Sequence, residues 1–254
     1  MAVVNETRRI VGAGTSAAAW RADPALAAVA STALEALLLE ARRAVLVAPH
    51  PDDEILAWGG LLQQLAACAV PALLVAVTDG EASHPDSLLW PRERLRRQRP
   101  GETAAALASL GVTDVEVVRL GVADGGVTAA EDSLAEMLAA LLRPGDVLLT
   151  TWSEDGHPDH EACARACASA ARGADVRLLE TPVWGWHWNA PGANRMPLAR
   201  ARKLDLTIEQ VARKRDAMAC FISQREADPA CAATPILADA TVARSLTDYE
   251  LFFI

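Results

Sequence analysis

Short aliphatic segments alternate with Ala- and Leu-rich segments of helical length along most of the chain, and this alternation restricts the fold more than any other feature. The pattern is typical of parallel strands that are joined and covered by helices. It predicts an α/β fold of the Rossmann-like, doubly wound kind, with a mostly parallel sheet and helices on both of its faces. The expected strands are 44–48, 72–77, 115–120, 147–151 and 176–179, and the expected helices lie near 54–67, 101–110, 129–142, 158–171 and 207–222.

The whole chain, residues 1–254, is expected to form a single domain. Its 254 residues and 52% hydrophobic content suffice for one large α/β core, and no segment has the composition of a disordered linker. Residues 1–43 are read as an N-terminal extension with a helix that begins at Asp23 as N-cap and Pro24 as first helical residue. Residues 181–254 are expected to pack over the sheet and to wall a site.

Charge and hydropathy argue against two classes of partner. Lys and Arg number 24 against 33 Asp and Glu, and the net charge of −9 is the opposite of what a nucleic-acid-binding surface needs. No apolar run reaches the length of a membrane span, and charged residues interrupt the N-terminal positions where a signal-peptide core would lie. We therefore expect a cytoplasmic protein with no nucleic-acid or membrane partner, and the sequence leaves a homo-oligomer open.

Two near-identical pentapeptides carry the chemistry: HPDDE at 50–54 and HPDHE at 157–161. Each follows a predicted strand and opens a helix, with its His at the N-cap and its Pro at the first helical position. The fourth residue of each motif, Asp53 or His160, lies three positions after the His and faces the same way. Strand ends of this kind meet at the carboxyl edge of a parallel sheet, where open α/β folds keep their sites.

The motifs together offer the ligands of a catalytic zinc ion. Such an ion takes three protein ligands of nitrogen and oxygen type and leaves a fourth position for water. His50, Asp53 and His160 can supply the three. Asp52 and His157 then stay beside the metal without being needed as ligands, as a base for the water and a donor for the developing oxyanion.

The segments AVLVAPHPDDEILAWGG (44–60), VTDGE (77–81) and DGHPDH (155–160) resemble the PIG-L/LmbE-like family of zinc-dependent N-deacetylases. The resemblance covers roughly residues 44–225 and includes the pair Ser223-Gln224. It implies a hydrolase that removes an N-acyl group, usually N-acetyl, from an amino sugar or small glycoconjugate. It also implies one zinc ion per chain, although other divalent metals are compatible with these ligands.

The same resemblance assigns roles to individual residues. His50, Asp53 and His160 match the family's metal ligands, Asp52 matches its general base, and His157 matches the histidine that assists at the carbonyl oxygen. Asp159 is expected to orient His157. Arg99 and Asp124 are expected to contact the substrate.

The Trp-rich segment TPVWGWHWNAPG (181–192) is a second candidate for substrate contact. Trp184, Trp186 or Trp188 is expected to line the substrate mouth, and Trp186 and His187 are expected to contact the substrate. Aromatic faces suit the apolar faces of sugar rings, and the segment follows the end of a predicted strand. One position departs from the family pattern. A branch of the family carries a mobile tyrosine two residues before the matching histidine, whereas this chain has Asp155 there.

Three other interpretations compete with the N-deacetylase. The metal could serve hydrolysis of another amide or of an ester, since the metal centre does not discriminate what lies beyond the carbonyl. The chain could also bind metal without turnover, but a carboxylate such as Asp52 that is not needed as a ligand argues against this. Finally, the motifs could be helix caps with solvated acids, although two matched motifs at strand ends are seldom accidental.

Overall fold

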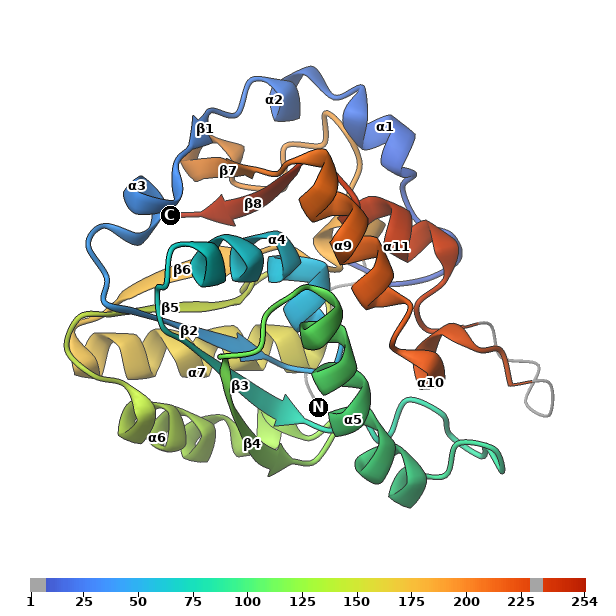
Figure 1. The fold of residues 1–254 in the computed structure, drawn as a ribbon. Coiled ribbons are helices and arrows are strands. Elements are labelled where there is room, and N and C mark those ends of the chain that lie inside the picture. Colours follow the sequence, from blue (N-terminus) through green and yellow to red (C-terminus); the bar gives the residue numbers. More distant parts are fainter. Residues whose placement is uncertain (1–7, 229–234) are drawn as a thin grey trace.

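The computed structural model describes residues 8–228 and 235–254, and its strands form one eight-stranded sheet in the order β1-β7-β8-β6-β5-β2-β3-β4. Five neighbouring strands run parallel, and they are the five that the sequence predicts (Figure 1). Their bounds are β2 (Arg43–Ala48), β3 (Ala72–Thr78), β4 (Glu116–Val122), β5 (Asp146–Thr151) and β6 (Arg177–Thr181). Positions 1–7 of the expected N-terminal extension and 229–234 of the expected C-terminal wall lie outside the described residues.

Helices cover both faces of the parallel strands, which confirms the doubly wound fold class. Alternate side chains of a strand point to opposite faces, and in β2 Val45 and Val47 enter one core while Ala44 and Leu46 enter the other. Figure 1 shows α7 and α4 on opposite sides of β2 and β5. One face carries α6 (Glu131–Leu141) and α7 (Pro158–Ala174), and the other carries α4 (Asp53–Ala67), α5 (Arg92–Ser109) and α9 (Ile208–Met218).

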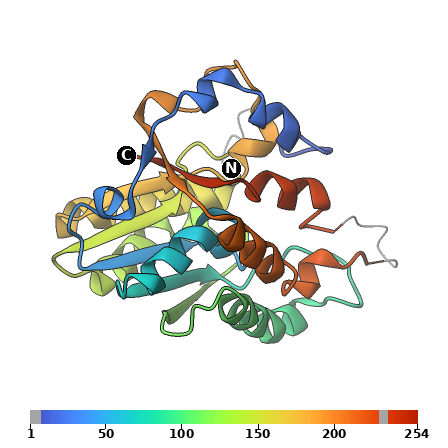
Figure 2. The same ribbon diagram turned by 45° about the horizontal axis from the view of Figure 1, so that its top comes forward.

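Three strands beyond β6 are absent from the sequence prediction. They are β1 (Ser31–Thr32), β7 (Ala201–Asp205) and β8 (Tyr249–Phe253), and β8 is antiparallel to both of its neighbours. Each is short, and the charged residues in β7 and the buried Glu250 in β8 interrupt the aliphatic runs by which a strand is recognised. Figures 1 and 2 show α1 (Ala17–Arg21) and α2 (Pro24–Ala27) lying over this end of the sheet.

The remaining helical elements are short. They are α3 (Leu34–Leu38), η1 (Val127–Ala130), α8 (Gly185–Trp188), η2 (Leu198–Arg200), α10 (Ile222–Arg225) and α11 (Asp239–Ser245). The helix expected at Asp23 begins as predicted, with the Asp23 carboxylate accepting from the Ala25 N–H at 2.9 Å, but it ends after four residues. Among the described residues, no helix has both the length and the apolar composition that a bilayer span requires.

Helix α5 differs most from its prediction. The sequence predicts a start near 101, after Pro100, whereas the helix starts at Arg92 and continues through Pro100. An interior proline removes one helical hydrogen bond. Here Leu95 and Arg99 are buried before it and Glu102 after it, so tertiary contacts on both sides of the proline hold the helix together.

A buried carboxylate holds the second half of α4, the helix that begins with Asp53. Trp58 leaves the helical region of φ and ψ, and this kink divides the helix. Glu250 on β8 accepts hydrogen bonds from the N–H groups of Gly60 and Leu61, at 2.7 and 2.8 Å. Lys214 on α9 neutralises this carboxylate at 2.6 Å, and both side chains are buried. The C-terminal elements are thereby tied to the helix that carries a candidate ligand.

Candidate metal centre and its cavity

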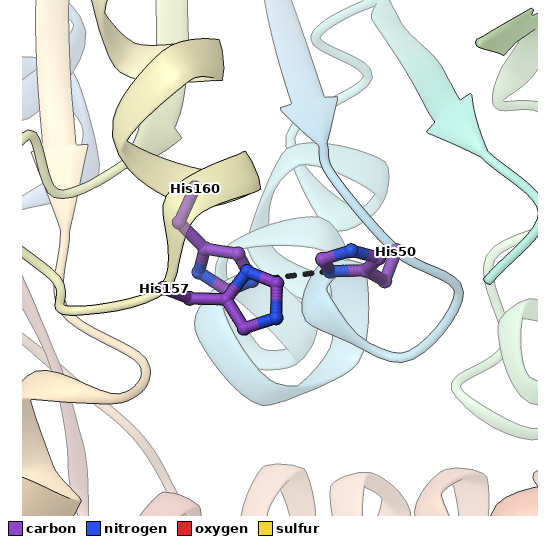
Figure 3. Close-up of side chains that lie close together, drawn as sticks. All are labelled: His50, His157 and His160. Atoms are coloured by element: carbon purple, nitrogen blue, oxygen red, sulfur yellow. Dashed lines mark hydrogen bonds between the residues drawn. The ribbon is translucent and has the colours of Figure 1, made fainter. Parts of the chain in front are cut away.

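The two pentapeptides meet because β2 and β5 are neighbours. The strands pair in parallel, with Val47 opposite Thr150, and both end within two residues of that pair. His50 lies in the loop between β2 and α4, while His157 and His160 lie at the start of α7. Figure 3 shows the three rings converging, and their centroids are 4.8 to 5.2 Å apart.

Three donor atoms form a nearly equilateral triangle. His50 Nδ1 lies 3.2 Å from His160 Nε2 and 3.5 Å from Asp53 Oδ2, and the latter two atoms are 3.3 Å apart. Zinc bonds of about 2.0–2.1 Å at tetrahedral angles separate neighbouring ligand atoms by about 3.3 Å. The triangle therefore has the size of one face of a zinc tetrahedron, and these residues fit the metal that the sequence implies.

Carboxylates hold the outward nitrogen of both ligand histidines. His160 Nδ1 lies 2.8 Å from Asp155 Oδ2, and both side chains are fully buried. His50 Nε2 lies 3.4 Å from Asp124 Oδ1 and 3.3 Å from Asp159 Oδ2. Metal-binding histidines usually donate their second N–H to such a partner, which fixes the tautomer and orients the ring. Both rings have this support.

Two other groups of donor atoms also lie within 4.8 Å of one another, namely His50–His157–His160 and His50–Asp124–Asp159. The acids of the second group have other duties. Asp159 accepts from the N–H groups of Gly125 and Val127, and Asp124 accepts from that of Ala82. His157 in the first group uses its Nδ1 to cap α7. Asp53 Oδ2 likewise accepts from the His50 N–H at 3.0 Å, so these contacts do not separate the three sets. The set that includes Asp53 has donor separations of 3.2 to 3.5 Å and is the candidate ligand set that the family resemblance predicts.

The charges of the cluster favour a cation. Burial opposes ionisation of Asp53, yet His160 and His50 hold the pKa of its carboxyl far below the usual range. Burial also lowers the pKa of His160, but Asp53 and Asp155 outweigh it and raise that pKa to about 9. Nearby acids likewise raise the pKa of His50 well above its usual value despite burial. Protons and a metal ion compete for these atoms, so metal binding releases protons.

Asp52 has a strained backbone and a side chain in the same cavity. Its φ of 127° and ψ of −30° lie in a region that residues with a side chain rarely adopt, at a cost of about 1–3 kcal/mol. Burial raises the pKa of its carboxyl well above the usual range, and the charges of Asp53 and Glu54 add to that rise. Asp52 lines the cavity beside His50 and His157.

His157 presents an N–H group to the cavity. Its Nδ1 accepts from the backbone N–H of Asp159 at 3.3 Å, so the neutral ring carries its proton on Nε2. Burial lowers the pKa of His157, and the neighbouring His160 and His50 lower it further, which keeps the ring neutral. The predicted role of Asp159 in orienting His157 needs correction, because its carboxylate bonds to His50 and the loop amides, and its hydrogen bond to His157 comes from the backbone N–H.

The cavity at the triangle has a volume of about 300 Å³, near the lower end of small-molecule pockets. Arg99 lines this cavity; it is buried and donates to the carbonyl of Gly80 at 2.6 Å and to Ser83 Oγ at 2.8 Å. Larger cavities lie elsewhere, but that of about 460 Å³ between α5 and β4 contains no histidine. The polar lining includes Ser83, Arg99, Asp124 and Gln224, and the apolar lining includes Leu56, Trp184, Ile236 and Leu237.

The predicted substrate contacts of Trp186 and His187 need correction. Neither residue lines the cavity, whereas Trp184 does, with its ring 6.5 Å from that of His157. Trp186 packs edge-to-face on Trp20 at 5.2 Å, and the His187 ring is held by Arg244 at 3.0 Å. The reason is the short helix α8, which turns successive side chains in different directions.

Asp155 is a residue of the candidate site to which the sequence analysis gave no role. Besides holding His160, its carboxylate accepts the N–H groups of Val183, Trp184 and Gly185 at 2.8 to 2.9 Å. One buried acid thus orients a ligand and anchors the segment that carries the aromatic wall. Its position two residues before HPDHE was the available signal, but the partners come from a segment almost thirty residues away in the chain.

The fold and the donor set define an α/β protein with a candidate mononuclear metal centre at the carboxyl ends of its parallel strands. The chain belongs to the PIG-L family, described as GlcNAc-PI de-N-acetylase, whose model matches residues 45–171, half of the chain.

Named relatives are similar to this chain in sequence, and solved structures are similar to it in fold. The 1D-myo-inositol 2-acetamido-2-deoxy-alpha-D-glucopyranoside deacetylase of Thermobispora bispora is 33% identical over 145 residues, which are 47% of this chain and 48% of the relative. The chain thus spans about half the length of such relatives. The zinc-inhibited form of teicoplanin deacetylase Orf2 has a TM-score of 0.57 at 18% identity and covers 73% of this chain and 87% of its own. The deacetylase Dbv21, for the A40926 pseudoaglycone, has a TM-score of 0.57 at 22% identity and covers 84% and 96%. At these identities the two structures show a shared fold.

We expect the protein to bind about one zinc ion per chain, and the ligand triangle predicts which variants lose it. Asp53→Ala should weaken zinc binding by more than about 100-fold, because loss of a supporting partner alone costs about 10–100-fold. The matched change His157→Gln should leave the affinity within about threefold of wild type. Competition with a chromophoric chelator measures both. The opposite ranking of the two variants would assign the metal to the three histidines instead.

Proposed function

We propose that the chain is a zinc-dependent hydrolase that removes an N-acyl group, in the first place N-acetyl, from an amino sugar or small glycoconjugate. The observation that carries the proposal is the ligand triangle with two further groups in the same cavity, the Asp52 carboxylate and the His157 Nε2. The names of relatives support the substrate class, since the proteins of Thermobispora bispora and Bacillus cereus are named deacetylases of acetamido-glucopyranosyl inositol and of N-acetylglucosaminyl malate.

The residues divide the chemistry of amide hydrolysis among them. His50, Asp53 and His160 would hold the zinc ion, which would supply a Lewis acid to lower the pKa of a water and polarise a carbonyl. Asp52 accepts the proton of the attacking water, because its carboxylate lines the same cavity as His50 and Asp53. His157 donates its Nε2–H to the oxygen that becomes negative as the tetrahedral centre forms. Asp52 then returns its proton to the leaving nitrogen.

Substrate positioning falls to the cavity walls. Arg99 is fixed by its bonds to Gly80 and Ser83, and together with Asp124 it is suited to contact sugar hydroxyls. Asp124 also lies near His50, so it joins the sugar site to the metal site. The Trp184 ring offers an apolar face to the sugar. Metal binding without catalysis explains neither the strained Asp52 backbone nor its buried carboxylate, whereas catalysis accounts for both.

The variant Asp52→Asn tests the proposed function most simply. It keeps the size of the side chain and removes its ability to accept a proton, so kcat should fall by about 10²–10⁴-fold. KM and zinc content should change little, because the lost interaction belongs to the transition state. Acetate release is measured on glycosides of N-acetylglucosamine, with zinc determined on the same preparation. Full zinc with near wild-type turnover would mean that another group activates the water.

A pair of tryptophan variants tests the wall of the cavity. Trp184→Ala should raise KM for an N-acetylated glycoside by about 3–10-fold, the equivalent of about 0.5–1.5 kcal/mol for one aromatic contact. Trp186→Ala removes the packing on Trp20 and should lower the melting temperature while KM stays within about twofold. Steady-state kinetics and thermal unfolding on both variants decide. An effect on KM from Trp186→Ala alone would instead place Trp186, and not Trp184, at the substrate.

A further inference from the structure

Side chains that are not candidate metal ligands hold the strained backbone conformation of Asp52. The Asp52 N–H donates to Glu54 Oε2 at 2.8 Å, and Thr103 Oγ1 on α5 donates to the other Glu54 oxygen, also at 2.8 Å. All three residues are buried. Thr103 on α5 therefore holds one carboxylate oxygen of Glu54, and the other oxygen accepts from the Asp52 N–H.

The carbonyl of the same peptide unit is held from the opposite end of the chain. Gln224 on α10 donates its Nε2–H to the Pro51 carbonyl oxygen, and its side chain is buried. The Pro51 carbonyl and the Asp52 N–H belong to one planar peptide group. With both polar ends bonded to buried side chains, the plane of that peptide cannot turn.

The next peptide is fixed as well, by the helix that follows. The Asp52 carbonyl accepts from the N–H groups of Ile55 and Leu56 at 3.0 and 2.9 Å, as the first acceptor of α4. When the planes on both sides of a residue are fixed, its φ and ψ are fixed, and so is the direction of its Cβ. This explains how Asp52 stays at a φ of 127°, from which its side chain lines the cavity.

We propose that Thr103, Glu54 and Gln224 form a peptide clamp that aims the Asp52 carboxylate at the attacking water. The inference rests on the proposed function for the role of Asp52, while the clamp itself rests on the hydrogen bonds above. Thr103 does not line the substrate cavity, so it is a positioning residue that acts through Glu54 and Asp52.

The test uses the pair Thr103→Val and Thr103→Ser in the full chain. Valine keeps the shape and removes the hydroxyl, and serine keeps the hydroxyl. A misplacement of about 1 Å at a reacting group costs up to about 100-fold, so Thr103→Val should lower kcat by about 10–100-fold. KM should stay within about twofold and zinc content should be unchanged, and Thr103→Ser should restore at least half of the wild-type kcat.

A crystal structure of Thr103→Val gives a readout that needs no activity. The clamp predicts that the φ of Asp52 leaves the positive region and that its carboxylate turns from the cavity. A second pair of variants repeats the test at Glu54. Glu54→Met removes the acceptor oxygens and should lower kcat as Thr103→Val does. Glu54→Gln keeps one acceptor oxygen and should not lower kcat in this way.

The two proposals fail in different ways. If wild-type protein releases no acetate from any N-acetylated sugar, the proposed function fails and the φ of Asp52 in the variant still decides the clamp. If Thr103→Val keeps wild-type kcat or the φ of Asp52 stays near its wild-type value, the clamp is overturned. A fall in kcat that merely follows loss of zinc or of folded protein overturns it too, because Thr103 would then only pack α5.

Discussion

Parallel pairing between β2 and β5 ends both strands at the same edge of the sheet, and the whole candidate site is built outward from that edge. Val47 lies opposite Thr150, and adjacent strands are only about 4.8 Å apart. The segment that follows each strand therefore needs few residues to bring His50 Nδ1 within 3.2 Å of His160 Nε2. Both pentapeptides then continue directly into helices, which fixes the third donor, Asp53, within the same triangle.

Buried carboxylates join this centre to the rest of the molecule. Asp155 connects ligand His160 to the backbone of 183–185, so the ring orientation and the position of Trp184 depend on one acid. Asp159 connects His50 to the loop after β4 through the N–H groups of Gly125 and Val127. Because each acid has several partners in place, the donor atoms are preorganised, and the negative charge of the cluster is left for a cation.

The parts of the molecule that local sequence determines were predictable, and the parts that distant contacts determine were not. The five parallel strands are aliphatic runs bounded by turn residues, and both pentapeptides lie between a strand end and a helix start. His157 is the N-cap of α7 as predicted, whereas α4 begins two residues later than predicted, at Asp53 with Asp52 as N-cap. Strand β8 depends on its pairing with β7, which lies far from it in the sequence, so the residues of β8 alone do not predict a strand. The directions of Trp186 and His187 depend on the phase of a four-residue helix. The roles of Asp155, Gln224 and Thr103 arise from partners far along the chain.

Diffraction from crystals of the zinc-loaded protein, with the anomalous signal recorded at the zinc edge, tests the central claim most directly. The triangle of donor atoms predicts one peak per chain at about 2.0–2.2 Å from His50 Nδ1, Asp53 Oδ2 and His160 Nε2. Asp52 and His157 should lie nearby without being bonded to the metal. A peak bonded to His157, or one between His50 Nε2, Asp124 and Asp159, would contradict the account and leave the roles of the remaining residues to be assigned anew.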